Sequence, residues 1–210
     1  MQTERRQIMG PAGLIDAVLH TATDSAPRGV AVVCHPHPVH GGNMEHKVVA
    51  TLVRAFLQLG YRAVRFNFRG VGVSAGAWDE GRGEIDDALA VIAAVRDPAA
   101  PLALAGFSFG AYVASQAAAR LAVNAATRVE RLVLVGPATQ TFEVAAVAAD
   151  TLVIHGEADE VVPLLATFDW ARQQALPVTV VPGAGHFFHG QQTLLKNIVV
   201  GAWHARPTAT

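Results

Sequence analysis

Two hydrophobic patterns alternate along most of the chain. Short, unbroken apolar runs rich in Val, Leu and Ala predict buried strands, and most are followed by a longer segment with apolar residues at helical spacing. This order predicts an α/β fold, with a mostly parallel sheet, right-handed crossovers and helices on both faces. The predicted strands span residues 29–34, 62–66, 102–106, 131–135, 151–155 and 178–181, and the predicted helices span 44–59, 83–95, 111–121, 164–174 and 191–204.

The N-terminal segment follows a different pattern. Short apolar stretches over residues 5–10 and 14–21 flank a Gly-Pro-Ala-Gly turn signal. We therefore expect an antiparallel hairpin to precede the parallel part of the sheet. The chain has 210 residues, which suits one domain with a sizeable core, so we expect a single domain over residues 1–210.

Composition narrows the class of protein. Hydrophobic residues make up 51% and charged residues 16%, which suits a sheet buried on both faces and argues against disorder. The net charge is −1 and no basic stripe is visible, so we expect no nucleic-acid partner. No apolar run is long enough for a bilayer or forms a signal peptide, so we expect a soluble, cytoplasmic monomer or homodimer without membrane contact. Cys34 is the single cysteine, and its apolar surroundings predict a buried, inert thiol.

A candidate nucleophile follows the predicted strand 102–106. Residues 106–110 read G-F-S-F-G and stand directly before an alanine-rich helix. In this context G-x-S-x-G is typical of a serine on a sharp strand-to-helix turn, where flanking glycines permit close backbone approach. The alternative is an ordinary glycine-rich turn with a capping serine. We interpret Ser108 as the nucleophile, with the helix N-terminus supplying N–H groups for an oxyanion.

A nucleophilic serine needs a base, and the base needs an acid to orient it. In proteins with such a strand–serine–helix turn, the order along the chain is Ser, then Asp or Glu, then His, so we expect the orienting acid next. Three acids follow the predicted strand 151–155, namely Glu157, Asp159 and Glu160. We favour Asp159 because the next helix begins soon after it. Glu157 and Glu160 are interpreted as charges on the face of the loop.

The base is expected after one further strand. His186 follows the strand 178–181 in a Gly-rich loop, which lets the imidazole reach over the serine, and His189 is interpreted as a bystander. His20 and His204 are interpreted as surface residues. His155 is interpreted as a support of the acid loop.

The loop over residues 35–43 reads HPHPVHGGN and carries two opposing interpretations. In this fold it supplies the second oxyanion donor, beside the N–H of Phe109. Both loop prolines lack an N–H, so the backbone of His37 is the best candidate. The same letters spell H-x-H-x-x-H, similar to the zinc motif of metallo-β-lactamase-like hydrolases, although Val39 stands where those enzymes carry aspartate. The backbone interpretation accounts better for the prolines and glycines.

Several segments together resemble the small, cap-less serine α/β-hydrolases of bacteria over nearly the whole chain. They read CHPHPVHGGNMEHKVV, YRAVRFNFRGVGVSAG, DEGRGEIDDALA, LALAGFSFGAYVA, LVIHGEADEVVP and GAGHFF. The resemblance implies the α/β-hydrolase fold, a triad of Ser108, Asp159 and His186, and an oxyanion hole from the backbone of His37 and Phe109. Dienelactone hydrolases are similar more distantly, and they use cysteine as nucleophile.

The connection over residues 136–150 is short, so we expect no cap domain and an open, shallow pocket. We expect Phe107, Phe142 and Phe187 to line this pocket together with Phe109, which favours small or short-chain acyl substrates. The expected activity is ester hydrolysis through an acyl-enzyme, without metal or cofactor. A thioesterase, an amidase and a non-catalytic binding protein with this fold are the alternatives.

Overall fold

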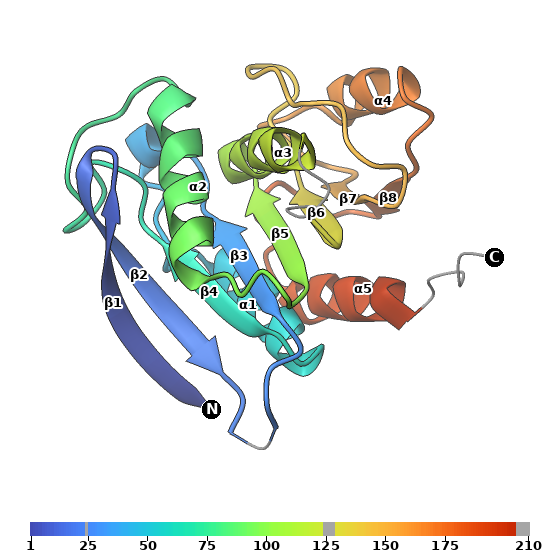
Figure 1. Ribbon diagram of the computed structural model, residues 1–210. Coiled ribbons are helices and arrows are strands. Elements are labelled where there is room, and N and C mark those ends of the chain that lie inside the picture. The colour runs from blue at the N-terminus through green and yellow to red at the C-terminus, as the bar shows by residue number, and fades with distance from the viewer. Residues whose placement is uncertain (24, 124–128, 205–210) are drawn as a thin grey trace.

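The computed structural model describes residues 1–23, 25–123 and 129–204, and within them eight strands form one sheet (Figure 1). The strand order is β1-β2-β4-β3-β5-β6-β7-β8. The strands are β1 (Gln2–Gly10), β2 (Gly13–Thr21), β3 (Val30–Cys34), β4 (Arg62–Phe66), β5 (Leu102–Phe107), β6 (Arg131–Val135), β7 (Leu152–Gly156) and β8 (Val178–Val181). The helices are α1 (Lys47–Gln58), α2 (Arg82–Val95), α3 (Phe109–Ala122), α4 (Leu164–Arg172) and α5 (Gln192–His204), with a short 3-10 helix η1 (Pro38–His40).

The sheet is parallel from β4 to β8 and antiparallel at its N-terminal edge. The hairpin of β1 and β2 pairs antiparallel and joins the sheet through an antiparallel pairing of β2 with β4. All pairings among β3 to β8 are parallel. This arrangement confirms the predicted fold class. The carboxyl ends of the parallel strands share one edge, so the loops after β3, β5, β7 and β8 lie close together there.

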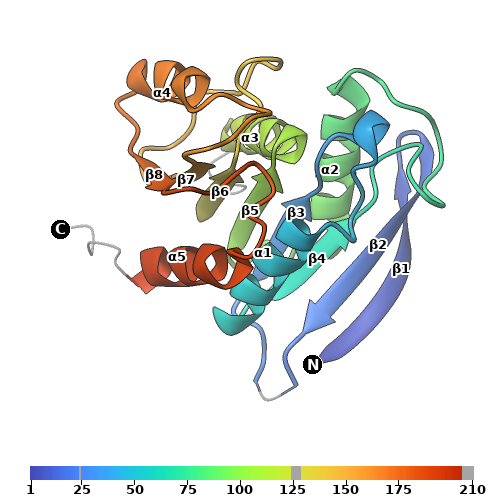
Figure 2. The ribbon, with the colours of Figure 1, turned by 180° about the vertical axis from the view of Figure 1, so that it is seen from behind.

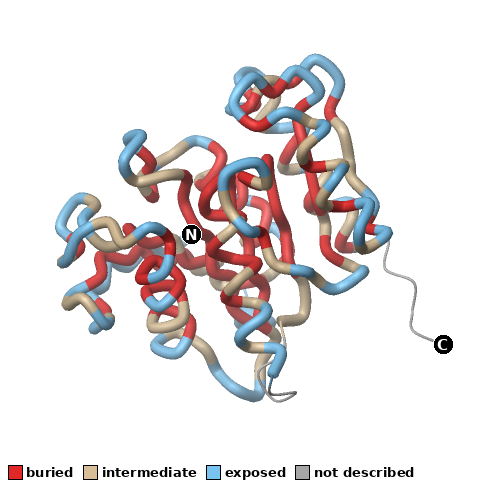
Figure 3. Tube along the Cα trace, turned by 90° about the horizontal axis from the view of Figure 1, so that it is seen from above, coloured by how far each residue is buried: buried red, intermediate tan, exposed pale blue. Residues whose placement is uncertain are grey.

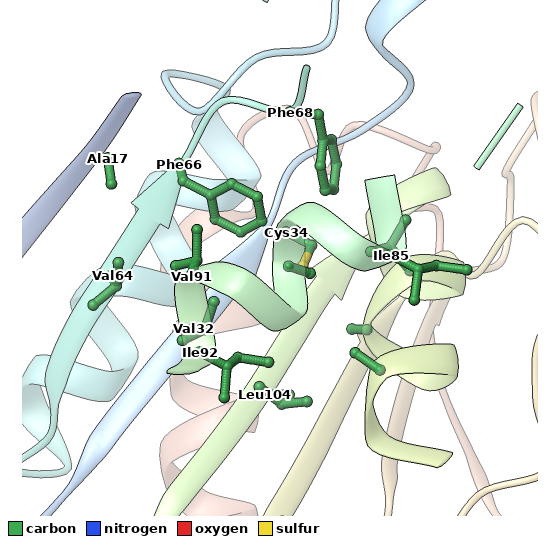
Figure 4. Packing of buried hydrophobic residues seen from close by; sticks show 14 of the residues in the cluster. Ala17, Val32, Cys34, Val64, Phe66, Phe68, Ile85, Val91, Ile92 and Leu104 are labelled. Carbon is green, nitrogen blue, oxygen red and sulfur yellow. The ribbon is translucent and has the colours of Figure 1, made fainter. Parts of the chain in front are cut away.

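Helices cover the two faces of the sheet in pairs. In Figure 1, α2 and α3 lie in front of the sheet, and α1 and α5 lie in front in the opposite view of Figure 2. Val32, Cys34 and Leu104 face α2 and α3, as Figure 4 shows for this cluster, whereas Val33 and Ala105 belong to the cluster under α1 and α5. Figure 3 shows buried strands at the centre and exposed loops around them. Cys34 is 2% exposed, which confirms the prediction of a buried thiol.

Most element boundaries agree with the sequence pattern, and one differs for a clear reason. β4, β6 and β8 match the predicted strands residue for residue. Helix α1 begins at Lys47 instead of residue 44, because the N–H of Met44 donates to the Asn67 side chain (2.9 Å). His46 then caps the helix by accepting the N–H of Val48 (3.3 Å). The segment before Lys47 is thus held outside the helix by a contact from the end of β4.

The prediction that His20 lies at the surface is wrong. His20 is only 6% exposed, because β2 is an inner strand between β1 and β4. Its Nε2 accepts the Nε–H of Arg65 (3.1 Å), and its Nδ1 lies 3.3 Å from the Thr3 hydroxyl. Burial and the neighbouring Arg65 lower the pKa of His20. The side chain of His204 lies outside the described residues.

The connection between β6 and β7 confirms the prediction of no cap domain. Residues 136–151 form turns and irregular segments between the two strands. None of the described helices combines the length and the hydropathy that crossing a bilayer requires. The connection after β6 therefore places no cap domain over the carboxyl edge of the sheet.

Candidate active site

Ser108 lies on the sharp turn between β5 and α3. Its backbone is strained, with φ 56° and ψ −117°, a region that residues with a side chain rarely adopt. The turn needs glycine on both sides, since a Cβ on Gly106 would lie 2.0 Å from the Gly110 carbonyl oxygen and a Cβ on Gly110 would lie 2.3 Å from that of Cys34. The N–H of Ser108 donates to the Val135 carbonyl of β6 (2.9 Å). This packing holds Ser108 in the geometry of a nucleophile elbow.

Asp159 and His186 meet in a buried hydrogen bond. His186 Nδ1 lies 2.7 Å from Asp159 Oδ2, and the other carboxylate oxygen accepts the N–H groups of Val161 (2.9 Å) and Val162 (2.8 Å). Burial alone raises the pKa of Asp159, but the hydrogen bonds from His186, Val162 and Val161 outweigh it and hold the pKa below its ordinary value. Asp159 is therefore an ionised carboxylate at neutral pH, and its charge faces His186.

Gly136 and Phe107 pack against this pair. Gly136 has φ +50°, and a Cβ there would lie 3.3 Å from His186 Cε1 and 3.6 Å from Asp159 Oδ2. The Phe107 ring lies 4.8 Å from the imidazole of His186, centroid to centroid. The sequence analysis did not single out Gly136, although a glycine directly after β6 at the active edge is a usable signal. A side chain at this position would be strained by the positive φ and would crowd the His186 ring, whereas its contact with Asp159 would be an ordinary one.

Ser108 and His186 line one pocket of about 180 Å³. Within the described chain no hydrogen bond joins the Ser108 hydroxyl to His186, and such bonds are often long before substrate binds. No lining residue is Asp, Glu, Lys or Arg. The other lining residues are Pro36, His37, His40, Gly41, Gly42, His46, Val161 and Phe187.

Phe109 and His37, whose N–H groups were expected to form the oxyanion hole, both lie close to Ser108. Phe109 is the first residue of α3, so its N–H has no acceptor inside the helix. His37 lies across the pocket, and its carbonyl accepts the N–H groups of His40 (3.1 Å) and Gly42 (2.9 Å), which fixes the loop. A Cβ on Gly42 would lie 2.1 Å from the Pro36 carbonyl oxygen, so this tight turn depends on glycine.

Known proteins match both the fold and the sequence of this chain. A family model described as the alpha/beta hydrolase fold matches residues 38–150. The crystal structure of XC6422 from Xanthomonas campestris, a member of the a/b serine hydrolases without lid, is 38% identical in sequence, with a TM-score of 0.87. That match covers 100% of this chain and 97% of XC6422. The chain belongs to the α/β-hydrolase family.

Two further relatives extend this comparison. An alpha-beta serine hydrolase homologue from Coxiella burnetii is 36% identical with a TM-score of 0.82, covering 96% of this hydrolase and 97% of the homologue. The uncharacterized protein RP471 of Rickettsia prowazekii is 44% identical over 111 residues, which are 51% of this chain. The match covers 46% of RP471, so the chain spans about half the length of that relative. The predicted resemblance to cap-less serine hydrolases is confirmed.

His35, which could have served zinc, is engaged with the backbone of the hydrolase. It is fully buried, its Nδ1 lies 2.6 Å from the Pro36 carbonyl oxygen, and its Nε2 accepts the N–H of Phe68 (3.1 Å). Burial lowers the pKa of His35 to about 3, so the ring is neutral. Neither nitrogen has a lone pair free for a metal, and across the described residues no three His, Cys, Asp or Glu side chains form a group that could hold one. The geometry therefore disfavours the zinc interpretation.

Three of the four aromatic residues expected in the pocket do not line it. Phe107 is fully buried, because it lies on the same face of β5 as Ala103 and Ala105, the face that α1 and α5 cover. Phe142 stacks on Tyr112 of α3 (4.9 Å) and lines a neighbouring groove, since the connection after β6 folds over α3. Phe109 is fully buried as well, so the expectation is wrong for all three of these residues. Phe187 does line the pocket and is 41% exposed.

His46 lines the pocket and was missed by the sequence analysis. Its Nδ1 accepts the N–H of Val48, so the proton of the neutral ring is on Nε2. The ring lies 5.1 Å from Phe107 and 5.8 Å from Phe187. Burial and, to a lesser extent, the proximity of His186, His189 and Lys47 lower the pKa of His46 to about 4. A helix prediction that began at residue 47 would have identified His46 as a capping residue.

Proposed function

We propose that this hydrolase cleaves carboxylic esters through an acyl-enzyme on Ser108, with His186 as general base and Asp159 as the orienting acid. One observation carries the proposal. The Asp159–His186 hydrogen bond (2.7 Å) lies beside a pocket that also contains Ser108 on its strained turn. A nucleophile, a base and an orienting acid in this arrangement are what acyl transfer to water requires.

The hydrogen bond to Asp159 sets the direction of proton transfer. An ionised carboxylate only accepts, so His186 carries its proton on Nδ1 and presents the lone pair of Nε2. Nε2 takes the proton of Ser108 as its oxygen attacks the ester carbonyl, and the oxyanion accepts the N–H groups of His37 and Phe109. His186 then gives the proton to the leaving alcohol, and water repeats the cycle on the acyl-enzyme.

The pocket supports a small, uncharged acyl group. Its volume of about 180 Å³ is below the roughly 300–1,000 Å³ typical of sites for drug-sized ligands. Its lining contains no Asp, Glu, Lys or Arg that would pair with a charged substrate. Both features favour short-chain esters over charged or long-chain ones.

A fluorophosphonate probe tests the nucleophile without knowledge of the natural substrate. We expect one adduct on the purified wild type and none on Ser108→Ala, measured by intact mass, because the probe reacts only with an activated serine. Circular dichroism of both proteins controls for folding. A folded wild type without an adduct would contradict the proposal and favour a binding protein with this fold.

A substrate panel tests the chemical class. We expect p-nitrophenyl acetate and butyrate to have higher kcat/KM than the octanoate and palmitate, because the pocket is small. Matched acyl thioesters and aryl amides, measured beside them, distinguish esterase from thioesterase and amidase activity. Faster turnover of long-chain esters, thioesters or amides would contradict the substrate class proposed above.

A further inference from the structure

The carboxylate of Asp159 faces a second imidazole besides His186. His155 Nε2 lies 3.3 Å from Asp159 Oδ2 and 2.9 Å from the carbonyl oxygen of Val162. The His155 ring, at the end of β7, is fully buried, and so is the Asp159 side chain. Oδ2 of Asp159 therefore lies between two imidazoles, of which only His186 reaches the pocket.

The hydrogen-bond partners of His155 fix its protons. A carbonyl oxygen only accepts, so the contact with Val162 requires the proton of His155 on Nε2. The unprotonated Nδ1 then accepts from the Thr167 hydroxyl of α4 (3.2 Å). Thr167 lies 3.3 Å from the Thr139 hydroxyl, which donates to it in this arrangement. The donors in this chain all point toward the Val162 carbonyl, which lies beside Asp159.

His155 remains neutral beside the ionised acid. Burial lowers its pKa and outweighs the opposite effects of the Val162 hydrogen bond and the Asp159 charge, while His186 lowers it further. A neutral His155 leaves the charge of Asp159 available to the imidazolium that forms on His186. The same Nε2–H also keeps Val162, whose own N–H binds Asp159, in place.

We propose that His155 is a positioning residue, which holds Val162 through its Nε2–H and lies against Asp159 so that the carboxylate stays beside His186, and that Thr167 fixes the tautomer this role needs. The inference rests on the proposed function, since it acts through Asp159 and His186. Among the described residues, the titratable groups that face Asp159 and His186 are His155 from β7 and His46 before α1.

Thr167 offers a matched pair of variants. Thr167→Val is nearly isosteric but removes the donor to His155 Nδ1, and Thr167→Ser keeps that donor. With p-nitrophenyl acetate, and after normalising to the sites that fluorophosphonate titrates, we expect Thr167→Val to lower kcat about three-fold with KM unchanged. We expect Thr167→Ser to keep the wild-type value.

His155→Gln tests the stronger form of the inference. We expect kcat to fall about ten-fold with KM within about two-fold. The acid limb of the kcat/KM profile should move to lower pH, because the His186 imidazolium loses part of its counter-charge when Asp159 is no longer held. A residue that only supports the fold would change the melting temperature and the titrated fraction, but not this limb.

The outcomes separate the inference from the proposed function. Variants that keep the wild-type kcat per titrated site and the wild-type acid limb overturn the positioning role, and so does a loss of kcat that Thr167→Ser fails to restore. If His155→Gln does not fold, the comparison of Thr167→Val with Thr167→Ser still tests the positioning role. A folded wild type that does not react with the probe overturns the proposed function, and the inference with it.

Discussion

Two loops at the carboxyl edge of the sheet contribute to the candidate site in opposite ways. The loop after β3 and the loop after β7 each begin beside a buried histidine with a lowered pKa, His35 and His155. His35 binds only backbone groups, and its loop contains His37, the proposed second oxyanion donor. His155 binds a side chain and lies against Asp159, whose carboxylate is what its loop offers.

This difference indicates where side-chain identity matters. Under the proposed mechanism the first loop acts through its backbone, so several side chains at residue 37 should be tolerated if the N–H stays in place. In the second loop the carboxylate itself faces His186, so under the proposed mechanism a side chain without its negative charge cannot replace it. Activity should therefore be most sensitive to loss of the carboxylate in the loop after β7 and to loss of the backbone N–H in the loop after β3.

The largest effect is expected for Asp159→Asn. An amide can donate to His186 Nδ1 and impose the wrong tautomer, so kcat should fall about 10⁴-fold while the fold is kept. Glu157→Gln and Glu160→Gln are the matched controls in the same loop, and each should stay within about two-fold of the wild type. Glu157 only accepts the N–H of Gly183, which glutamine can also do. Ester turnover measures all three, and a loss for Glu157→Gln as large as that for Asp159→Asn would reassign the acid.

A smaller effect is expected for the N–H of His37. His37 has φ −54°, which proline can adopt, so His37→Pro removes the N–H without forcing the backbone. We expect kcat about 10²–10³-fold lower than for His37→Ala, which loses the same imidazole but keeps the donor. Steady-state kinetics with p-nitrophenyl acetate compares the two variants. Equal kcat values would show that this N–H does not stabilise the oxyanion.

The smallest effect concerns stability at mildly acidic pH. The pKa of His35 falls from 6.5 to about 3 on folding. Because folding favours the neutral ring, its contribution to stability is complete above pH 6.5 and is lost progressively as the pH falls toward 3. His35 should thus lower the free energy of unfolding by about 2 kcal/mol between pH 7 and 5.

Urea unfolding at the two pH values measures this loss. His35→Gln should be less stable than the wild type at pH 7, since Gln fits the acceptor position of the Phe68 N–H less well. It should nevertheless show a smaller decrease toward pH 5, because its side chain does not titrate. An equal decrease in both proteins would mean that His35 is not responsible.

The sequence pattern predicted the parallel part of the sheet well, because buried parallel strands are apolar on both faces and end at Gly, Pro or polar residues. It also put Ser108, Asp159 and His186 after strands whose carboxyl ends meet. It could not give the start of α1, which depends on a hydrogen bond from Asn67, distant in the sequence. The surroundings of Phe142 depend on the path of an irregular connection, which no periodicity encodes.

The misplacement of Phe107 has a different cause. Alternation along β5 puts it on the same face as Ala103 and Ala105, so the sequence did contain the information. A position next to the serine in the sequence does not by itself bring a side chain into the pocket. Only the residue at the turn itself projects into the pocket, and the residue before it packs beneath His186.

Labelling of the Cys34 thiol can report how often the core of the hydrolase opens. It is the only cysteine in the sequence, and its thiol lies in the core between β3 and the helices α2 and α3. Burial raises the pKa of this thiol, so reagents that need the thiolate reach it only when the core is exposed to water. The rate at which a thiol reagent labels the native protein therefore measures how often the core opens, without any added probe.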